Sequence, residues 1–462
     1  MVVQHNMQAL NANRMLGITT GAQAKSTEKL SSGYKINRAA DDAAGLSISE
    51  KMRKQIKGLD QASTNAQDGI SAVQTAEGAL TEVHSMLQRM NELVVQAANG
   101  TNSEQDRQSI QDEIDQLTTE IDRVAETTKF NEAYLLKGNG KDTTVNINAK
   151  DAGIEGHMMG VGTGTATFTM DALKTGEQIT IGSKGYTIGS SISEVQNAVS
   201  GAQAGETVTI NGTAYEVVTT SVPEENQYSI ADLQRLVSDG DKVIVGSSTY
   251  VAMTDKDGTG TVGAGIGDND ASVISAEKAF NLIMNELEKA SSVGADAGAD
   301  ATASGTYQAA DEEWTFTITE GTVATTQGLQ FTLHVGADAD ENNKIALTID
   351  AMDTTSLGVA NINVVDNTGA KATYAIDSIA DAIAKVSAQR SELGAVQNRL
   401  EHTIANLDKV VENTTAAESQ IRDTDMAEQM VDYSKNNILM QAGQSMLTQA
   451  NQATQGVLSL LG

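Results

Sequence analysis

The chain of 462 residues contains no cysteine, a single proline and few aromatic residues. Without cysteine it forms neither disulfide bonds nor thiolate metal sites. Because proline occurs only at Pro223, long helices can run uninterrupted through the rest of the chain. Aromatic residues make up 3% of the sequence, whereas ordinary globular cores depend on such bulky side chains. The composition therefore favours extended helix bundles, packed with Ala, Val and Leu, over one large globule.

The sequence also lacks a long apolar run and an excess of positive charge. No run of 18 apolar residues occurs, which predicts no membrane insertion. The start, MVVQHNMQALNANRML, has no basic region followed by an apolar one, so it is not a secretory signal peptide and, taken alone, indicates a cytoplasmic protein. The net charge is −30, and residues 139–370, with 10 basic and 32 acidic side chains, carry −22 of it. Such an acidic segment repels nucleic acid and anionic membrane, so neither is an expected partner.

Two stretches near the ends of the chain keep an alternating three- and four-residue apolar spacing. The spacing averages 3.5 residues, the period of a coiled-coil seam, and predicts two long helices. Neither helix can bury its seam on itself, so the two ends of the chain are expected to pack together. The first seam is Met52, Gln55, Leu59, Ala62, Ala66, Gly69, Val73, Ala76, Leu80, Val83, Leu87, Met90, Val94 and Ala97; the second is Ile376, Ile379, Ile383, Val386, Arg390, Leu393, Gln397, Leu400, Ile404, Leu407, Val411 and Thr414.

Polar residues and glycines interrupt both seams. Gln55, Arg390 and Gln397 either fix the register between helices or lie at the seam's edge with solvated head groups. Glycines at 58, 69 and 78 each cost about 1 kcal/mol relative to alanine. Close helix contact, or conformational freedom, would justify them.

Shorter helices flank the seams. One is predicted from about residue 4 to residue 32, with a weak apolar face and a stop at Gly33. A third follows the first seam, and a last helix follows the second. The last helix carries an apolar stripe suited to contact with another subunit: Leu439, Ala442, Met446, Ala450, Ala453, Val457 and Leu460. The candidate N-caps are Asp41, Asp42, Asn102, Ser103, Thr424 and Asp425.

Between the seams the apolar period changes from 3.5 to 2, which predicts β-strands. The expected strands are TVNINAK (144–150), ATFTM (166–170), EWTFTIT (313–319), LQFTLHV (329–335), KIALTID (344–350) and ANINVV (360–365). A repeat also occurs, because residues 176–188, 205–217 and 240–252 each place a tyrosine ten residues after an opening glycine. Helical segments follow, at 191–200, 229–238 and 276–290. We therefore predict two or three ββα units.

The chemistry of an enzyme is missing from the sequence. The five histidines form no metal-binding pattern, and the glycine clusters do not follow the strand-to-helix pattern of a nucleotide loop. We expect no enzyme, no cofactor and no metal.

The two ends carry long motifs. KLSSGYKINRAADDAAGLSISEKMRKQIKGLDQASTNAQDGISAVQTAEGAL (29–80) resembles the N-terminal signature of bacterial flagellin. NRLEHTIANL (398–407), AESQIRDTDMAEQM (417–430) and the ending GVLSLLG resemble its C-terminal signature. The implied fold is a multidomain α+β protein, with a long coiled-coil-like helical bundle built from both termini and a β-rich, ββα-repeat central projection. Its expected parts are inner-tube helices (1–44 and 420–462), a helical rod (45–138 and 371–419), a β-hairpin or linker region completing the rod (139–175), a ββα-repeat outer domain (176–292) and a β-rich segment returning to the rod (293–370).

The resemblance implies a homopolymer, the helical flagellar filament used for swimming. Implied partners are the flagellar type III export apparatus, a cytoplasmic export chaperone, and the filament cap and hook-associated proteins. Export through the flagellar type III apparatus needs no cleavable signal peptide. The resemblance therefore overrules the prediction of a cytoplasmic protein and implies a secreted, extracellular one. Assembly contacts are expected at Met7, Leu10, Leu439, Met446, Val457 and Leu460.

The segment 87–117 resembles the stretch by which host Toll-like receptor 5 recognises flagellins. Leu117 replaces an arginine often found there, which would weaken binding. Leu93 and Ile110 have a second reading as helix-packing residues. The implied receptor contacts are Gln88, Arg89, Glu92, Leu93, Gln96, Ile110, Asp112, Glu113 and Gln116.

Two alternatives stay open. A junction protein between hook and filament shares the terminal helices, although the complete GVLSLLG and DTDMAEQM segments favour the filament subunit. The middle could also be an active module: missing His/acid clusters argue against an enzyme, but a glycan-binding adhesin is compatible with the sequence.

Overall fold

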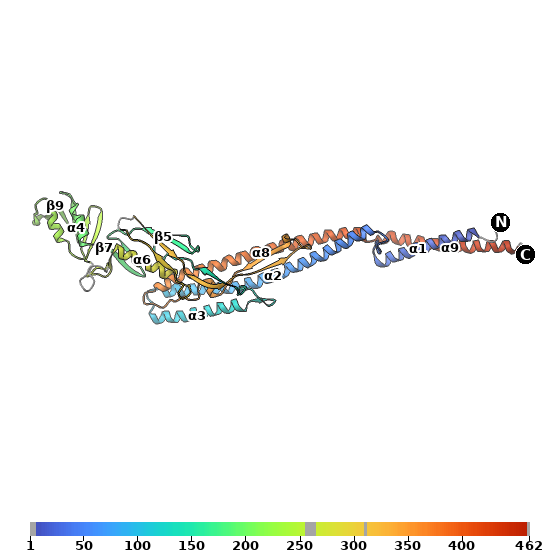
Figure 1. The fold of residues 1–462 in the computed structure, drawn as a ribbon, viewed down its shortest axis with the longest axis horizontal. Coiled ribbons are helices and arrows are strands. Elements are labelled where there is room, and N and C mark those ends of the chain that lie inside the picture. The colour runs from blue at the N-terminus through green and yellow to red at the C-terminus, as the bar shows by residue number, and fades with distance from the viewer. Residues whose placement is uncertain (1–5, 255–264, 309–311, 460–462) are drawn as a thin grey trace. The chain divides into compact units, whose positions relative to one another are not determined.

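A computed structural model describes residues 6–254, 265–308 and 312–459 (Figure 1). The chain divides into two compact units. One comprises the residues up to 71, residues 332–347 and those from 396 onward; the other comprises residues 72–331 and 348–395. Two long helices, α2 (Ala43–Ala98) and α8 (Ala370–Arg422), contribute to both units. The predicted α+β fold is confirmed.

The predicted seams form the buried faces of α2 and α8. Every seam residue of α2 from Ala62 to Ala97 is buried, and α8 buries Ile379, Val386, Leu393, Leu400 and Leu407. The seam residues of α8 between these are half-buried. The 3.5-residue period thus predicted the inward faces correctly.

In the first unit, α1 (Met7–Ser32) packs along α9 (Met426–Ser459). Most half-buried residues of α9, all but Asn437, recur at the same three-four spacing: Gln429, Tyr433, Asn436, Met440, Gly443, Leu447 and Ala450. Ser26, buried on α1, accepts a hydrogen bond from Gln429 Nε2 at 3.0 Å, and Asn6 Nδ2 donates to the Ala450 carbonyl at 3.0 Å. This seam is partly polar, so it holds the two helices together by hydrogen bonds as well as by apolar contact.

The breaks between α1 and α2 and between α8 and α9 are joined to each other. Tyr34 and Asp423 form an antiparallel bridge, Lys35 N donates to the Arg422 carbonyl at 2.7 Å, and Thr424 N donates to the Gly33 carbonyl at 3.0 Å. Gly33 ends α1 with a φ of +78°, which glycine adopts without strain. Asp42 caps α2 and Asp425 caps α9, as predicted.

The second unit contains α3 (Glu104–Thr127), α6 (Ala276–Ser291) and most strands. Ser103 begins α3 with a reciprocal capping box to Asp106. A four-stranded antiparallel sheet has the order β14-β15-β5-β4. Its strands are β4 (His157–Met159), β5 (Thr165–Asp171), β14 (Thr302–Ser304) and β15 (Glu313–Thr319). Phe280 of α6 stacks on Phe316 and meets Trp314 edge-on, so α6 closes this sheet's core.

Smaller pairings complete the β structure. β3 (Asp142–Asn146) pairs with β16 (Thr322–Thr326), which is far away in sequence. The pairs β1–β2 and β17–β18 join strands that are close in sequence. Their bounds are β1 Lys129–Phe130, β2 Ala133–Tyr134, β17 Leu329–His334 and β18 Lys344–Ile349. Short helices are η1 (Pro223–Glu225), η2 (Glu341–Asn343) and α7 (Thr354–Leu357).

All three predicted hairpins are present and share one sheet. Its order is β10-β9-β8-β11-β12-β7-β13, with β6 paired to β7. The two-residue turn Asn211-Gly212 has positive φ at both positions, as a type I′ turn requires. The strands are β6 (Gln178–Ile181), β7 (Lys184–Ser191), β8 (Thr207–Ile210), β9 (Thr213–Val217), β10 (Gln227–Tyr228), β11 (Lys242–Val245), β12 (Ser248–Met253) and β13 (Val273–Ser275).

The helix of the third copy differs from the other two. Helices α4 (Ile192–Ser200) and α5 (Ile230–Leu236) share one core with β8, β9, β11 and β12. Helix α6 follows the third hairpin but packs in the core of β5 and β15. Ser191, Ser229 and Ser275 cap the three helices alike, so the copies agree in local structure and differ in packing.

One predicted strand is wrong. Residues 360–365 (ANINVV) form no strand. The side chain of Gln111 on α3 forms hydrogen bonds with their backbone instead. Its Nε2 donates to the Ile362 carbonyl at 2.9 Å, and its Oε1 accepts from Val364 N at 2.8 Å. Ile362 and Val364 are both buried. A buried side-chain amide therefore satisfies the polar groups that a strand neighbour would otherwise pair.

Candidate functional site

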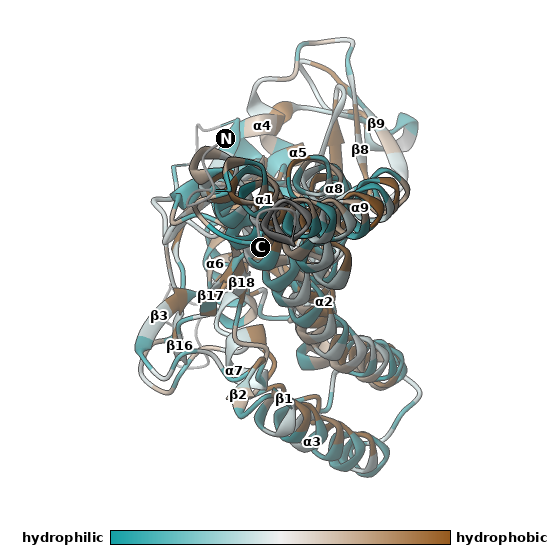
Figure 2. Cartoon of the chain, turned by 90° about the vertical axis from the view of Figure 1, so that its right-hand side faces the viewer, coloured by the Kyte–Doolittle hydropathy of each residue, from teal (hydrophilic) through white to brown (hydrophobic). Residues whose placement is uncertain are grey.

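Both terminal helices expose large apolar side chains. On α1, Met7 is 72% exposed and Leu10 is 61% exposed; on α9, Leu439 and Met446 are 47% and 59% exposed. Figure 2, an end-on view, shows apolar and polar residues mixed on the ribbons at this end of the chain. Val457 belongs to α9, and Leu460 lies outside the described residues. We call the exposed set the terminal apolar stripe: Met7, Leu10, Met15, Ile18, Met426, Met430, Val431, Ile438, Leu439 and Met446.

The terminal apolar stripe differs from the seam that joins α1 to α9. In α9 that seam runs through Tyr433, Met440 and Leu447, whereas Leu439 and Met446 lie beside it and stay uncovered. Several large apolar side chains left exposed on a folded chain indicate an interaction face. Burying a side chain of this size stabilises an assembly by roughly 1.5–3 kcal/mol.

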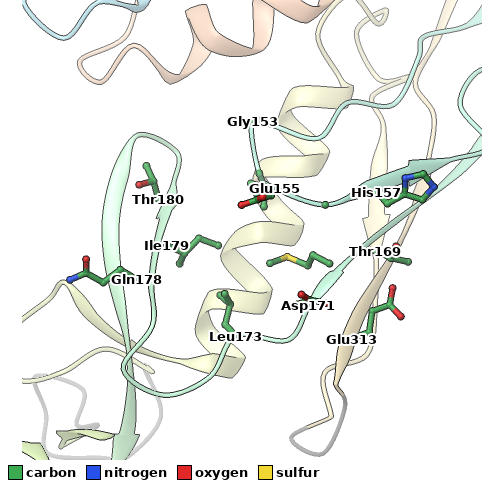
Figure 3. Close-up of a pocket in the computed structure, with 13 residues that line it drawn as sticks. Gly153, Glu155, His157, Thr169, Asp171, Leu173, Gln178, Ile179, Thr180 and Glu313 are labelled. Atoms are coloured by element: carbon green, nitrogen blue, oxygen red, sulfur yellow. The ribbon is translucent and has the colours of Figure 1, made fainter. Parts of the chain in front are cut away.

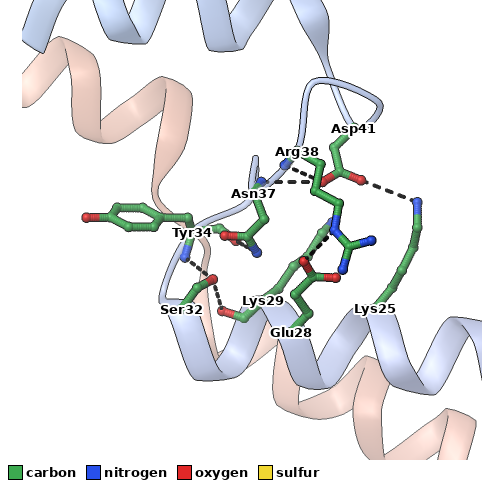
Figure 4. Close-up of polar contacts among 8 residues, drawn as sticks. All are labelled: Lys25, Glu28, Lys29, Ser32, Tyr34, Asn37, Arg38 and Asp41. Atoms are coloured by element: carbon green, nitrogen blue, oxygen red, sulfur yellow. Dashed lines mark hydrogen bonds and ion pairs between the residues drawn. The ribbon is translucent and has the colours of Figure 1, made fainter.

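The loop after α1 is held by a polar cluster (Figure 4). Asp41 Oδ2 accepts from the backbone of Arg38 at 3.1 Å and of Asn37 at 3.3 Å, and Asp41 Oδ1 pairs with Lys25 Nζ at 3.3 Å. The Arg38 backbone N–H, chiefly, lowers the pKa of Asp41 below its usual value. Arg38 Nε reaches back to Glu28 at 2.9 Å. The motif GYKINRAADD thus encodes a shaped loop, and not only a cap.

The structure brings three of the predicted receptor contacts together on the surface of α2 and α3, and most of the others are exposed on the same two helices. Arg89 Nη1 pairs with Glu92 Oε2 at 3.0 Å, and Arg89 Nη2 with Glu113 Oε1 at 2.9 Å. Hydrogen bonds from Arg89 to Glu92 and Glu113 raise its pKa. Exposed residues of this surface, here called the Arg89 surface, are Gln88, Arg89, Glu92, Gln96, Asp112, Glu113 and Gln116.

Leu93 and Ile110 lie elsewhere. Leu93 is 2% exposed and Ile110 is 7% exposed, so both are buried inside the chain. Their placement matches the helix-packing reading. Leu117 is half-buried on the same helix as Ile110.

Comparison with known proteins agrees with the end motifs and with this helical architecture. Residues 3–141 match the bacterial flagellin N-terminal helical region, and residues 376–461 match the C-terminal helical region. The chain is 39% identical over 459 residues to a flagellin of Clostridium tyrobutyricum, covering 98% of this chain and all of the relative. The chain belongs to the bacterial flagellin family. It is also 36% identical to a flagellin of Bacillus subtilis (strain 168) and 33% identical to a flagellar filament 31.3 kDa core protein of Treponema maltophilum, in both cases over the full length of both chains.

Two polar residues that organise this flagellin's helices were missed by sequence reasoning. Arg107 is 1% exposed, and Gln111 is 9% exposed. A signal existed for Arg107: it is a cation near the start of α3, where the helix dipole favours acids. Such a residue implies another partner, which the structure shows to be the backbone at the end of α2.

Of the polar seam residues of this flagellin, one forms a contact that fixes the register between helices and another has a solvated head group. Arg390 Nη2 of α8 pairs with Glu77 Oε1 of α2 at 2.8 Å, as a register-fixing contact would. Gln397 is half-buried, and its Nε2 instead donates to Glu401 on its own helix at 3.0 Å in a solvent-exposed hydrogen bond. Gln55 is half-buried.

Within residues 6–254, 265–308 and 312–459, no group of three or more His, Cys, Asp or Glu is placed to hold a metal ion. No helix in the same part of the chain has both the length and the apolar content needed to span a bilayer.

Proposed function

We propose that this flagellin is a secreted subunit that polymerises into the extracellular flagellar filament and supports swimming. The observation that carries the proposal is the terminal apolar stripe, which is exposed in the single chain. The Treponema relative is itself named as a filament core protein. Neighbouring subunits in a helical polymer would cover this stripe.

The terminal helices suit assembly-coupled ordering. The α1–α9 seam includes Ser26, Gln429 and Asn436, so apolar burial within one chain is modest. Contact with neighbouring subunits would add the burial that offsets the ordering entropy. Weakly held ends also suit unfolded export through the flagellar type III apparatus, with a cytoplasmic chaperone at the C-terminal end. The filament cap and hook-associated proteins complete the proposed partners.

Seeded polymerisation tests the proposal. Purified protein mixed with short filament fragments should elongate into long filaments visible by negative-stain microscopy. A deletion strain should lose swimming, and the chain supplied in trans should restore it. Absence of elongation together with normal swimming in the deletion strain would reject the filament role.

The hook–filament junction protein is the competing assignment within this architecture. A junction protein would appear only at the base of the filament, whereas a filament subunit would label its whole length. Immunogold labelling of intact flagella separates the two.

The central residues 139–370 form, in our proposal, the outward-facing part of the subunit, with the five-part division given above. Antibodies raised against residues 176–292 should bind assembled filaments if that segment faces outward. A glycan-binding adhesin in this region predicts, in addition, filament retention on a glycan array.

A second proposed function is recognition by Toll-like receptor 5 through the Arg89 surface. The supporting observation is that side chains from two helices gather there and stay exposed, with Arg89 held between Glu92 and Glu113. Leu93 and Ile110 would then act indirectly, by fixing the spacing of α2 and α3. Receptor capture of the monomer, compared with capture of intact filaments, tests the proposal.

A further inference from the structure

Strand β6 borders a cleft of about 630 Å³ in the β-rich part of the chain (Figure 3). Gln178, Ile179 and Thr180 form one side. The opposite side consists of the end of β5, Glu313 of β15 and the loop 153–157.

Along this border β6 has no strand neighbour among the residues that the structure describes. The strand to which it pairs in that part of the chain is β7, in the register Gln178↔Thr187 to Ile181↔Lys184. Ile188 N donates to the Glu177 carbonyl at 2.8 Å, whereas Thr187 N turns to the other side and donates to the Ser272 carbonyl at 2.8 Å.

Hydrogen-bonded pairs alternate along an antiparallel ladder. The Glu177–Ile188 bond therefore places Ile179 and Ile181 at bonded positions. The backbone N–H and C=O groups of Gln178 and Thr180 consequently point away from β7, on the side of the cleft. Among the residues that the structure describes, none forms a hydrogen bond with these four groups.

The cleft combines an apolar floor with acidic walls. Ile154 and Met170 are buried, and Ile179 and Leu173 are half-buried, with the last two directed towards the cleft in Figure 3. Three exposed carboxylates surround them, from Glu155, Asp171 and Glu313, with His157 beside them. None of the thirteen described lining residues is a lysine or an arginine.

We propose that the cleft binds an extended cationic peptide, which adds to the free edge of β6 as a further strand. Backbone pairing would use Gln178 and Thr180, as in other strand-addition complexes. Alternate side chains of such a peptide point to opposite faces. Apolar ones would meet Ile179 and Met170, and lysines or arginines would meet the carboxylates.

A second copy of this chain is a poorer occupant of the same edge. Pairing β6 with β6 would bring two acidic clefts together, and like charges at close range repel. A cationic strand instead gains attraction that is screened by salt, whereas its backbone pairing is not. Binding is therefore expected to weaken with salt without vanishing.

The test uses the full chain and a fluorescein-labelled octapeptide of alternating Lys and Val, followed by fluorescence anisotropy at low salt. Thr180→Pro removes one free N–H at an edge position that tolerates proline. It should weaken binding roughly tenfold, while the matched control Thr180→Val should leave binding unchanged. The pair Asp171→Asn and Glu313→Gln should weaken binding and flatten its salt dependence.

A second probe separates strand addition from charge attraction. An octapeptide alternating Lys and Pro has the same charge but cannot pair as a strand. Equal affinity for both peptides, or unchanged binding by Thr180→Pro, would overturn the proposal, as would self-association through β6 without peptide binding.

Hydrogen exchange of the unmodified chain settles the matter if Thr180→Pro misfolds. Protection confined to residues 178–181 on addition of the Lys–Val peptide supports strand addition. Protection elsewhere, or none, contradicts it.

Discussion

Arg107 Nη1 donates a hydrogen bond of 2.7 Å to the backbone carbonyl of Asp366, 259 residues further along the chain. The same guanidinium donates to the Ala97 carbonyl at 2.8 Å and to the Asn99 carbonyl at 3.2 Å. The last carbonyls of a helix have no partner within the helix. One buried side chain therefore caps α2 and fixes the segment that leads into α8.

Arg107→Met keeps the length of the side chain and removes its donors. We expect the free energy of unfolding to fall by about 2–4 kcal/mol, since three carbonyls lose a buried partner. Urea unfolding followed by far-UV circular dichroism measures the loss. Arg123→Met is the matched control on α3, because Arg123 forms a solvent-exposed ion pair with Glu120, whose loss should leave stability almost unchanged. Equal effects of both variants would contradict the capping role.

Two glycines of α2 should respond to alanine in opposite directions. A Cβ at Gly69 would collide with the Leu333 side chain, and it would approach Leu400 Cδ1 to 3.3 Å, whereas a Cβ at Gly78 would meet nothing within 4 Å. Gly78→Ala should stabilise the monomer by about 1 kcal/mol. Gly69→Ala should destabilise it by about 1–3 kcal/mol. Thermal unfolding of both variants checks this. If Gly78→Ala stabilises the monomer but alters filament shape, Gly78 serves conformational switching.

Asp377 of α8 should make stability depend on pH. Burial first, and then the carboxylate of Asp151, raise the pKa of Asp377 above its usual value, and Lys150 partly offsets them. A raised pKa in the folded state means a stabilising contribution that is complete below the unfolded pKa and is lost as pH rises through the folded value. Relative to Asp377→Asn, the parent chain should therefore lose stability from about pH 4 upward.

Melting temperatures measured across this pH range provide the readout for Asp377. Glu392→Gln, on an exposed position of α8, should follow the parent curve. A constant difference between the parent and Asp377→Asn at every pH would refute the assignment.

Charge placed in the terminal apolar stripe should block assembly and spare the monomer. Leu439 and Met446 are exposed in the single chain, so Leu439→Asp or Met446→Asp should leave its circular dichroism unchanged. In a polymer an unpaired carboxylate would be buried there at a cost of several kcal/mol, and seeded elongation should stop. Met446→Leu should elongate normally. Normal elongation of both aspartate variants would place these residues outside the subunit contacts.

Arg89→Ala should weaken capture of the monomer by the receptor ectodomain about tenfold, as loss of an arginine hot spot does. Surface plasmon resonance gives the affinities. Arg123→Ala, on the same helical unit but outside the Arg89 surface, should bind as the parent does. Unchanged affinity of Arg89→Ala would remove this surface from the receptor contacts.

Much of the helical part could be predicted from sequence, because a helix seam is a local pattern. The buried face from Ala62 to Ala97 followed from spacing, and side-chain chemistry narrowed each cap to two neighbouring residues, of which the structure uses Asp42, Ser103 and Asp425. Long-range pairing could not be predicted in this way. A two-residue apolar period predicts a strand but does not identify the strand with which it pairs. The pairing of β3 with β16 could therefore not be predicted.

The candidate surfaces show the same division. The spacing of apolar residues placed Leu439 and Met446 on one stripe of the last helix, and both are exposed in the structure. Burial of Leu93 and Ile110 depended on how α2 and α3 meet, which spacing within one helix does not specify. Gln111 shows the limit most clearly, because a single side chain replaced the strand partner expected for residues 360–365.

The two hydrogen-bonded linkers between the helices, Gly33–Lys35 and Arg422–Thr424, have a mechanical consequence. Backbone hydrogen bonds join the two breaks, and the Arg422 guanidinium lies 4.7 Å from the centre of the Tyr34 ring. The α1–α2 linker and the α8–α9 linker lie beside each other. A bend at this point therefore requires no change of length in any of the four helices. Helices α1 and α9 would therefore change direction together, as one rigid pair, by rotation of the backbone at Gly33 and Thr424.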